Sequence, residues 1–113
     1  MKENMRQYKE DLKAVLLTAL RNVDCYLFLF GSRATKNPRK RADFDIGILA
    51  KKPIDFGLRY RLEGYVQGIP MPVDIVDFNR VDDDFRRIAL RHVEIWKRPK
   101  NPAGFKFNPT TCI

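Results

Sequence analysis

Residues 30–48 read FGSRATKNPRKRADFDIGI, and this stretch indicates the fold more strongly than any other part of the chain. The short apolar run 25–30 precedes it and stops at Gly31, as a buried strand would. A strand that ends in Gly31 and Ser32 and turns into a helix presents free backbone N–H groups, which attract phosphate. Gly31 lets the backbone approach a ligand closely because it has no Cβ. Ser32 adds a hydroxyl donor for a phosphate oxygen.

Two carboxylates follow the glycine after a basic loop. Asp43 and Asp45 lie two residues apart at the start of a second expected strand, 44–49, so they share one face of the sheet. Two negative charges this close are costly unless a cation lies between them. Carboxylates that leave room for phosphate favour Mg²⁺. The sequence therefore predicts a metal and nucleotide site here.

A third carboxylate is expected from the next strand, 72–78. Asp74 is flanked by apolar residues, where an aspartate is costly unless it is paired or coordinated. Asp77 is the competing candidate, but it lies three residues on, near the strand end, and should face the opposite side. We predict that Asp74 completes the site.

The three carboxylates suit a two-metal phosphoryl-transfer site. One Mg²⁺ is expected on Asp43, Asp45 and Asp74, and a second on Asp43, Asp45 and the triphosphate. Asp74 is also a candidate to accept the proton of the attacking hydroxyl. Attack at the α-phosphorus would attach a nucleoside monophosphate to the acceptor and release pyrophosphate. Arg33 either contacts phosphate or extends into solvent, and the loop Lys36, Arg39, Lys40 and Arg41 either steers an anionic partner or is simply solvated.

Around this centre the sequence predicts a small α/β (α+β) domain. An amphipathic helix covers 5–22, and a second helix, capped by Asp55, runs to Val66. Its candidate inward residues are Phe56, Tyr60, Leu62 and Tyr65. A last helix begins at Asp83 or Asp84 and passes through Trp96. With these helices flanking a mixed sheet of three to four strands, residues 1–98 form the domain, and the Pro-rich residues 99–113 form a C-terminal tail that is either flexible or draped over a neighbour.

Composition limits the remaining functional classes. The 113 residues suit one domain, and the formal charge of +8 fits an anionic partner or a merely basic surface. Charged residues interrupt the first twenty positions, so no signal peptide is expected. The apolar run 25–30, which opens with Cys25, is too short to cross a bilayer. We expect a cytoplasmic protein without membrane attachment, and no motif supports nucleic-acid binding.

The pattern Gly31-Ser32, ten residues, Asp43-Phe44-Asp45, and later Asp74 resembles the minimal nucleotidyltransferase (MNT) family of the DNA polymerase β-like superfamily. The resemblance covers roughly residues 23–96. Two positions depart from the family pattern, Ala42 where a serine is usual and Thr35-Lys36 where Arg-Gly is common. Neither departure removes a metal ligand.

This resemblance implies a polymerase β-like fold, in which the carboxylates Asp43, Asp45 and Asp74 are catalytic and bind metal. It also implies that Gly31 and Ser32, with Arg33 beside them, bind the triphosphate of ATP. Small members of the family act with an all-helical HEPN-family partner, often a toxic ribonuclease. In such a hetero-oligomer the nucleotidyltransferase is the antitoxin and moves AMP from ATP to a tyrosine hydroxyl of the partner.

Two other functions stay open at this point. The chain could be a non-catalytic antitoxin that neutralises its partner by contact through its basic surface and tail. It could also be the nucleotide-binding half of a two-chain nucleotidyltransferase for a small molecule such as an aminoglycoside.

Overall fold

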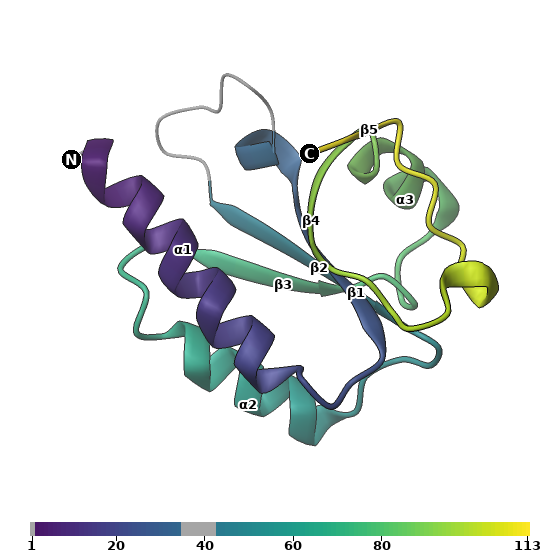
Figure 1. Ribbon diagram of the computed structural model, residues 1–113, viewed down its shortest axis with the longest axis horizontal. Coiled ribbons are helices and arrows are strands. Elements are labelled where there is room, and N and C mark those ends of the chain that lie inside the picture. The colour runs from purple at the N-terminus through teal and green to yellow at the C-terminus, as the bar shows by residue number, and fades with distance from the viewer. Residues whose placement is uncertain (1, 35–42) are drawn as a thin grey trace.

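The computed structural model describes residues 2–34 and 43–113 as a five-stranded mixed sheet with helices on both faces (Figure 1). The sheet order is β3-β2-β1-β4-β5. The elements in chain order are α1 (Lys2–Ala19), β1 (Cys25–Phe30), the 3-10 helix η1 (Gly31–Ala34), β2 (Phe44–Ala50), α2 (Phe56–Val66), β3 (Val73–Asp77), α3 (Asp83–Ala89), β4 (His92–Lys97), η2 (Pro102–Gly104) and β5 (Thr111–Cys112). The predicted α/β class is confirmed, with five strands rather than three to four.

The central position of β1 in the sheet explains why its sequence is apolar throughout. It pairs antiparallel with both β2 and β4, and all of its residues are buried. Leu27 and Leu29 join the core on one face, whereas Phe28 and Phe30 join the core on the other. A strand that is covered on both faces reads as a continuous apolar run. The strand predicted at 25–30 is therefore confirmed with its bounds.

One face of the sheet is covered by α1 and α2, which lie side by side (Figure 1). Leu12, Leu16 and Leu20 follow each other at intervals of four on α1 and are fully buried. This spacing forms the apolar side of an amphipathic helix, as the sequence predicts. In the part of the chain that the structure describes, no helix has both the length and the apolar character needed to cross a membrane.

Helix α2 turns a different side to the sheet than the sequence suggests. Asp55 caps it, as predicted, because its carboxylate accepts a hydrogen bond from the backbone N–H of Leu58 at 2.7 Å. Leu62 and Val66, four residues apart, are buried. Three side chains predicted to point inward are exposed instead, with exposed fractions of 88% for Phe56, 80% for Tyr60 and 53% for Tyr65. They lie outside the narrow strip that the leucine and valine define.

The other face of the sheet is covered by α3 and by the segment that follows β4. Phe107 stacks on Tyr26, with ring centres 4.0 Å apart, and contacts Phe28 at 4.9 Å. Phe105 meets Tyr26 edge-on at 5.6 Å. The structure thus differs from the flexible tail that the sequence analysis expects after residue 98, because these aromatic side chains cover an apolar face. The domain boundary at residue 98 stays a prediction.

The predicted last helix is wrong beyond Ala89. There α3 ends, and residues 92–97 form β4 beside β1. Val93 and Trp96 are spaced as one side of a helix would be, but in the strand they face opposite sides of the sheet. A short apolar segment with this spacing does not distinguish the two structures. Residues 110–113 then bond to β4 and to the two residues before it, for example from Ile113 N to Val93 O at 2.9 Å.

Cys25 is a free cysteine that is buried at the start of β1, where it acts as a small apolar residue. Burial raises the pKa of its thiol to about 11, with opposing charge effects from Lys97 and Asp24. The thiol is therefore protonated near neutral pH and contributes packing rather than reactivity.

Candidate active site

Asp43 and Asp45 lie at the start of β2, as predicted. Asp43 is exposed just before the strand, and Asp45 is half-buried within it. The neighbouring Phe44 and Ile46 are buried in the core under α1 and α2. Since side chains alternate along a strand, Asp45 points to the opposite face, the one that carries α3.

Asp74 lies directly beside Asp45. The strands β2 and β3 are parallel, and their register pairs Asp45 with Asp74. Val73 and Ile75 pack against the core under α1 and α2, so Asp74 also faces the α3 side, where it is exposed. The structure therefore brings together the two carboxylates that the sequence places on separate strands.

The neighbouring aspartates affect the pKa of Asp45 through their charges. Burial raises the pKa of Asp45 above its ordinary value, and the negative charges of Asp74 and Asp43 raise it further. The three residues thus form a local concentration of negative charge. A cation at this edge of the sheet would relieve the repulsion and favour the ionised form of Asp45.

Gly31 closes the site from β1. The last residue of β1, Phe30, pairs with Asp45, so the next residue passes directly over that carboxylate. Gly31 has a φ of 73°, and a Cβ added to it would lie 2.3 Å from Oδ2 of Asp45. The sequence predicts that the backbone approaches a ligand closely at Gly31. In the structure, the backbone at Gly31 closely approaches the Asp45 carboxylate.

The 3-10 helix η1 carries the other predicted phosphate-binding residues. Ser32 and Arg33 are half-buried there, next to Gly31. The guanidinium carbon of Arg33 lies 5.4 Å from the centre of the Phe44 ring, a cation–π contact. Arg33 is thereby held beside Phe44, whose ring lies on the face of the sheet opposite to Asp45. The predicted basic loop, with Lys36, Arg39, Lys40 and Arg41, lies outside the described residues.

The ligand atoms that these residues offer are of the type that binds a hard cation. Asp43, Asp45 and Asp74 offer carboxylate oxygens, the ligands that Mg²⁺ prefers, and the bare backbone at Gly31 leaves room beside them. Within residues 2–34 and 43–113, however, no three histidine, cysteine or acidic side chains are grouped so that they would hold a metal ion as they stand. Mutual repulsion disfavours such grouping when no cation is present.

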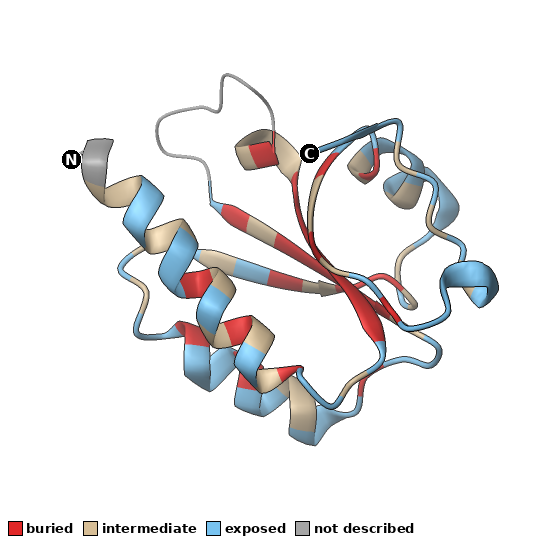
Figure 2. Ribbon diagram, in the orientation of Figure 1, coloured by how far each residue is buried: buried red, intermediate tan, exposed pale blue. Residues whose placement is uncertain are grey.

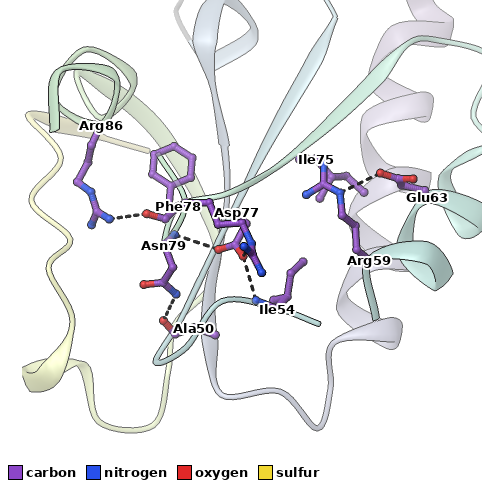
Figure 3. Close-up of polar contacts among 10 residues, drawn as sticks. Ala50, Ile54, Arg59, Glu63, Ile75, Asp77, Phe78, Asn79 and Arg86 are labelled. Carbon is purple, nitrogen blue, oxygen red and sulfur yellow. Dashed lines mark hydrogen bonds and ion pairs between the residues drawn. The ribbon is translucent and has the colours of Figure 1, made fainter. Parts of the chain in front are cut away.

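Asp77 lies on the other side of β3, as its spacing in the sequence predicts, and it has a structural role there. Its side chain is buried and accepts hydrogen bonds from the backbone N–H groups of Ile54 and Asn79, both at 2.9 Å (Figure 3). Arg80 approaches the same carboxylate at 3.3 Å. Asp77 therefore fixes the loop that leads into α2 and is not part of the cluster around Asp45.

Further polar contacts around β3 were not foreseen from the sequence. Arg59 of α2 donates to the backbone oxygen of Ile75 at 2.8 Å, and Asn79 donates to that of Ala50 at 2.7 Å (Figure 3). Arg86 of α3 donates to the backbone oxygen of Phe78. The Asn79 contact ties the turn after β3 to the end of β2, and the two arginines tie α2 and α3 to the same region. All three acceptors are backbone oxygens, which leave no signal in the sequence.

Comparison with known proteins identifies a matching protein family and a similar protein. The family described as "Polymerase beta, Nucleotidyltransferase" matches residues 8–101. A protein of Haemophilus influenzae named "Probable protein adenylyltransferase MntA" is 33% identical over 97 residues, which cover 81% of this chain and 85% of the relative.

Solved structures share the fold. A toxin–antitoxin structure with AMP-PNP superposes with a TM-score of 0.63 at 20% identity and covers 78% of this chain and 74% of its own. A tri-AMPylated Shewanella oneidensis HEPN toxin in complex with MNT antitoxin gives a TM-score of 0.59 at 19% identity, covering 79% and 71%. At these identities the likeness establishes the fold alone.

Proposed function

Because the chain belongs to the polymerase β nucleotidyltransferase family, we propose that it moves AMP from ATP to a tyrosine hydroxyl of a helical HEPN-type partner and acts as its antitoxin. One observation carries this proposal: Asp45 and Asp74 lie in register on neighbouring strands, with Gly31 packed against Asp45. Asp43 adds its charge to the same place. Such a set of carboxylates suits phosphoryl transfer.

The relatives support the details of substrate and partner. The Haemophilus influenzae relative is named a probable protein adenylyltransferase. One solved neighbour is an AMPylated HEPN toxin in complex with MNT antitoxin, and another was solved with AMP-PNP. We carry these properties over to this chain as part of the proposal, which places the reaction in the cytoplasm and in a hetero-oligomer.

The carboxylates would also hold the metal. In the proposed enzyme, Asp43, Asp45 and Asp74 hold two Mg²⁺ ions. When bound, these ions stabilise negative charge on the phosphates and lower the pKa of a nearby hydroxyl.

The chain's own residues bind and orient the reactants. Gly31, Ser32 and Arg33 bind the triphosphate at the end of β1. The acceptor oxygen bonds to the α-phosphorus, its proton passes to Asp74, and the bond to pyrophosphate breaks. The products are the AMP ester of the acceptor and pyrophosphate.

The test is intact-mass spectrometry of the HEPN-type protein encoded beside this gene, after incubation with this chain, ATP and Mg²⁺. We expect a gain of one or more AMP units that EDTA prevents. Asp43→Asn and Asp45→Asn should each lower the initial rate by at least about 100-fold, because each removes charge that faces the phosphates. Asp11→Asn is the matched control, since Asp11 is exposed on α1, which covers the other face of the sheet.

Full transfer by Asp45→Asn would overturn the catalytic assignment. A complex that forms without any AMP transfer would favour neutralisation by contact. In that case a triple Asp→Asn variant at the site should still protect cells from the partner.

A further inference from the structure

The two faces of the sheet differ in their access to the carboxylates. Asp45 and Asp74 project on the face opposite α1 and α2, because their strand neighbours pack under those helices. That same face carries α3 (Figure 1). An acceptor hydroxyl that reaches the carboxylates must therefore belong to a molecule that approaches from the α3 side.

Helix α3 exposes apolar side chains on this side. None of its seven residues, all described by the structure, is buried, and most of the helix is coloured as exposed in Figure 2. Phe85 is 42% exposed and Ile88 is 54% exposed. The two lie three residues apart and so are neighbours on the helix surface. Contiguous exposed apolar side chains are a common feature of protein interaction sites.

This apolar pair borders the carboxylate site. The ring of Phe85 meets that of Phe30 edge-on at 6.1 Å and that of Phe78 at 6.0 Å. Phe30 directly precedes Gly31 and pairs with Asp45. One aromatic side chain thus connects the surface of α3 to the glycine that touches the carboxylate.

The charge beside the pair is positive at the C-terminal end of α3. Arg87 and Arg91 are exposed there, four residues apart. Arg87 approaches Asp84 at 3.1 Å, but both side chains are largely exposed, and such a pair is weak. The two arginines therefore remain able to attract acidic groups of a partner.

We propose that Phe85 and Ile88, flanked by Arg87 and Arg91, form the docking surface for the protein that supplies the acceptor hydroxyl. The proposal rests on the proposed function and names the HEPN-type partner as the occupant. It requires apolar side chains of the partner, with acidic groups next to them, close to the tyrosine that is modified. The exposed aromatics of α2 lie in the layer on the other face of the sheet and do not adjoin the carboxylates.

The experiment measures the rate of AMP transfer as a function of partner concentration. It compares the unmodified full chain with two variants, Ile88→Glu and Tyr60→Glu, that each introduce a negative charge. Ile88→Glu should raise the KM for the partner by about tenfold or more, since truncation or charging of a central contact has effects of this size. The KM for ATP and the kcat at saturating partner should stay unchanged. Tyr60→Glu is the matched control on α2, where the side chain is 80% exposed, and it should leave all three constants unchanged. Urea unfolding checks that both variants remain folded.

Arg91→Glu tests the electrostatic part of the docking surface independently, because it leaves the apolar side chains unaltered. It should raise the KM for the partner, and its effect should diminish at high salt, because exposed charges are screened. A salt-independent effect would contradict the proposed electrostatic contribution.

The outcomes separate this surface from the proposed function. If the unmodified chain transfers AMP and Ile88→Glu leaves the KM unchanged, the docking surface is wrong while the reaction stands. If the unmodified chain transfers no AMP, the reaction is wrong, and calorimetric binding of the partner decides on the surface. Binding that Ile88→Glu weakens and Tyr60→Glu does not would then support it, and equal binding by both would overturn it.

Discussion

At the scale of single residues, Gly31 and Asp45 depend on each other. The positive φ of Gly31 disfavours any other residue, and its Cα faces the Asp45 carboxylate with no room for a methyl group. The same carboxylate has a raised pKa because of burial and of two neighbouring aspartates. The backbone here therefore passes close to one acidic group, an approach that glycine allows and other residues do not.

Gly31→Ala tests this coupling. The positive φ alone should lower the free energy of unfolding by about 1–2 kcal/mol. The added methyl group also displaces the Asp45 side chain, so AMP transfer should fall further than the loss of stability explains. Urea unfolding and the intact-mass assay, run on the same preparation, measure both effects.

A second glycine provides the control for Gly31→Ala. Gly64 lies in α2, where an added Cβ meets no atom within 4 Å. Gly64→Ala should stabilise the protein by about 0.5–1 kcal/mol, because alanine favours the helix, and it should leave transfer unchanged. Normal transfer by Gly31→Ala would show that the position of Asp45 is not set by the glycine.

The residue scale also shows what sequence can predict about a site. The sequence predicts that Asp43, Asp45 and Asp74 share a site because burying or clustering carboxylates has a recognisable cost, and the structure places Asp45 and Asp74 side by side. The structural role of Asp77 was not foreseen, since its partners are backbone N–H groups of Ile54 and Asn79. Backbone partners carry no signal in the sequence.

At the scale of elements, β4 is tied to α1 by one half-buried carboxylate. Glu94 accepts hydrogen bonds from Trp96 at 2.6 Å and from Lys9 at 3.0 Å. Burial acts to raise its pKa, but these two hydrogen bonds, with the charges of Lys9 and Lys13, hold the pKa below its ordinary value. The contact thus stabilises the ionised form of Glu94 in the folded protein.

This contact predicts a pH dependence of stability. A carboxyl group with a lowered pKa in the folded state stabilises the protein above its unfolded pKa, and that stabilisation is lost as the pH falls through the folded pKa. Glu94→Gln should therefore be less stable than the unmodified protein at about pH 7, and the difference should shrink toward about pH 3. Urea unfolding across this range checks it, and a difference that does not vary with pH would contradict it.

The sequence predicts helices and strands well where the pattern of apolar residues favours one type of secondary structure. The run 25–30 is short, rich in aromatic residues and stopped by Gly31, which favours a buried strand, and it is one. The segment around Val93 and Trp96 fits either a helix or a strand, and the structure decides for the strand because β1 needs a second neighbour. Similarly, the side of α2 that faces the sheet is set by packing against α1, which the sequence of α2 alone does not contain.

At the scale of the whole molecule, the last described residues complete one face of the core. Phe107 covers Tyr26 and Phe28 from outside the predicted domain. The sequence gives no periodicity from residue 99 on, so the docking of this segment depends on the shape of the face it covers. Long-range contacts of this kind are the part of the fold that a single sequence predicts least.

Phe107→Ala tests whether this segment contributes to stability. Loss of the stacked ring should lower the free energy of unfolding by about 2 kcal/mol, since it removes both apolar burial and an aromatic pair. Phe56→Ala is the control, because Phe56 is 88% exposed and its loss should change stability by less than about 0.5 kcal/mol. Equal unfolding midpoints for the two variants would show that the segment does not hold the face closed.

The central place of β1 has a consequence for synthesis on the ribosome. Its first neighbour, β2, leaves the exit tunnel soon after it, but its second neighbour begins at His92, far later in the chain. Until then, one edge of a wholly apolar strand is open to pairing with other chains. Nascent chains that stall between β2 and β4 should therefore be the aggregation-prone species of this protein and the natural clients of ribosome-bound chaperones.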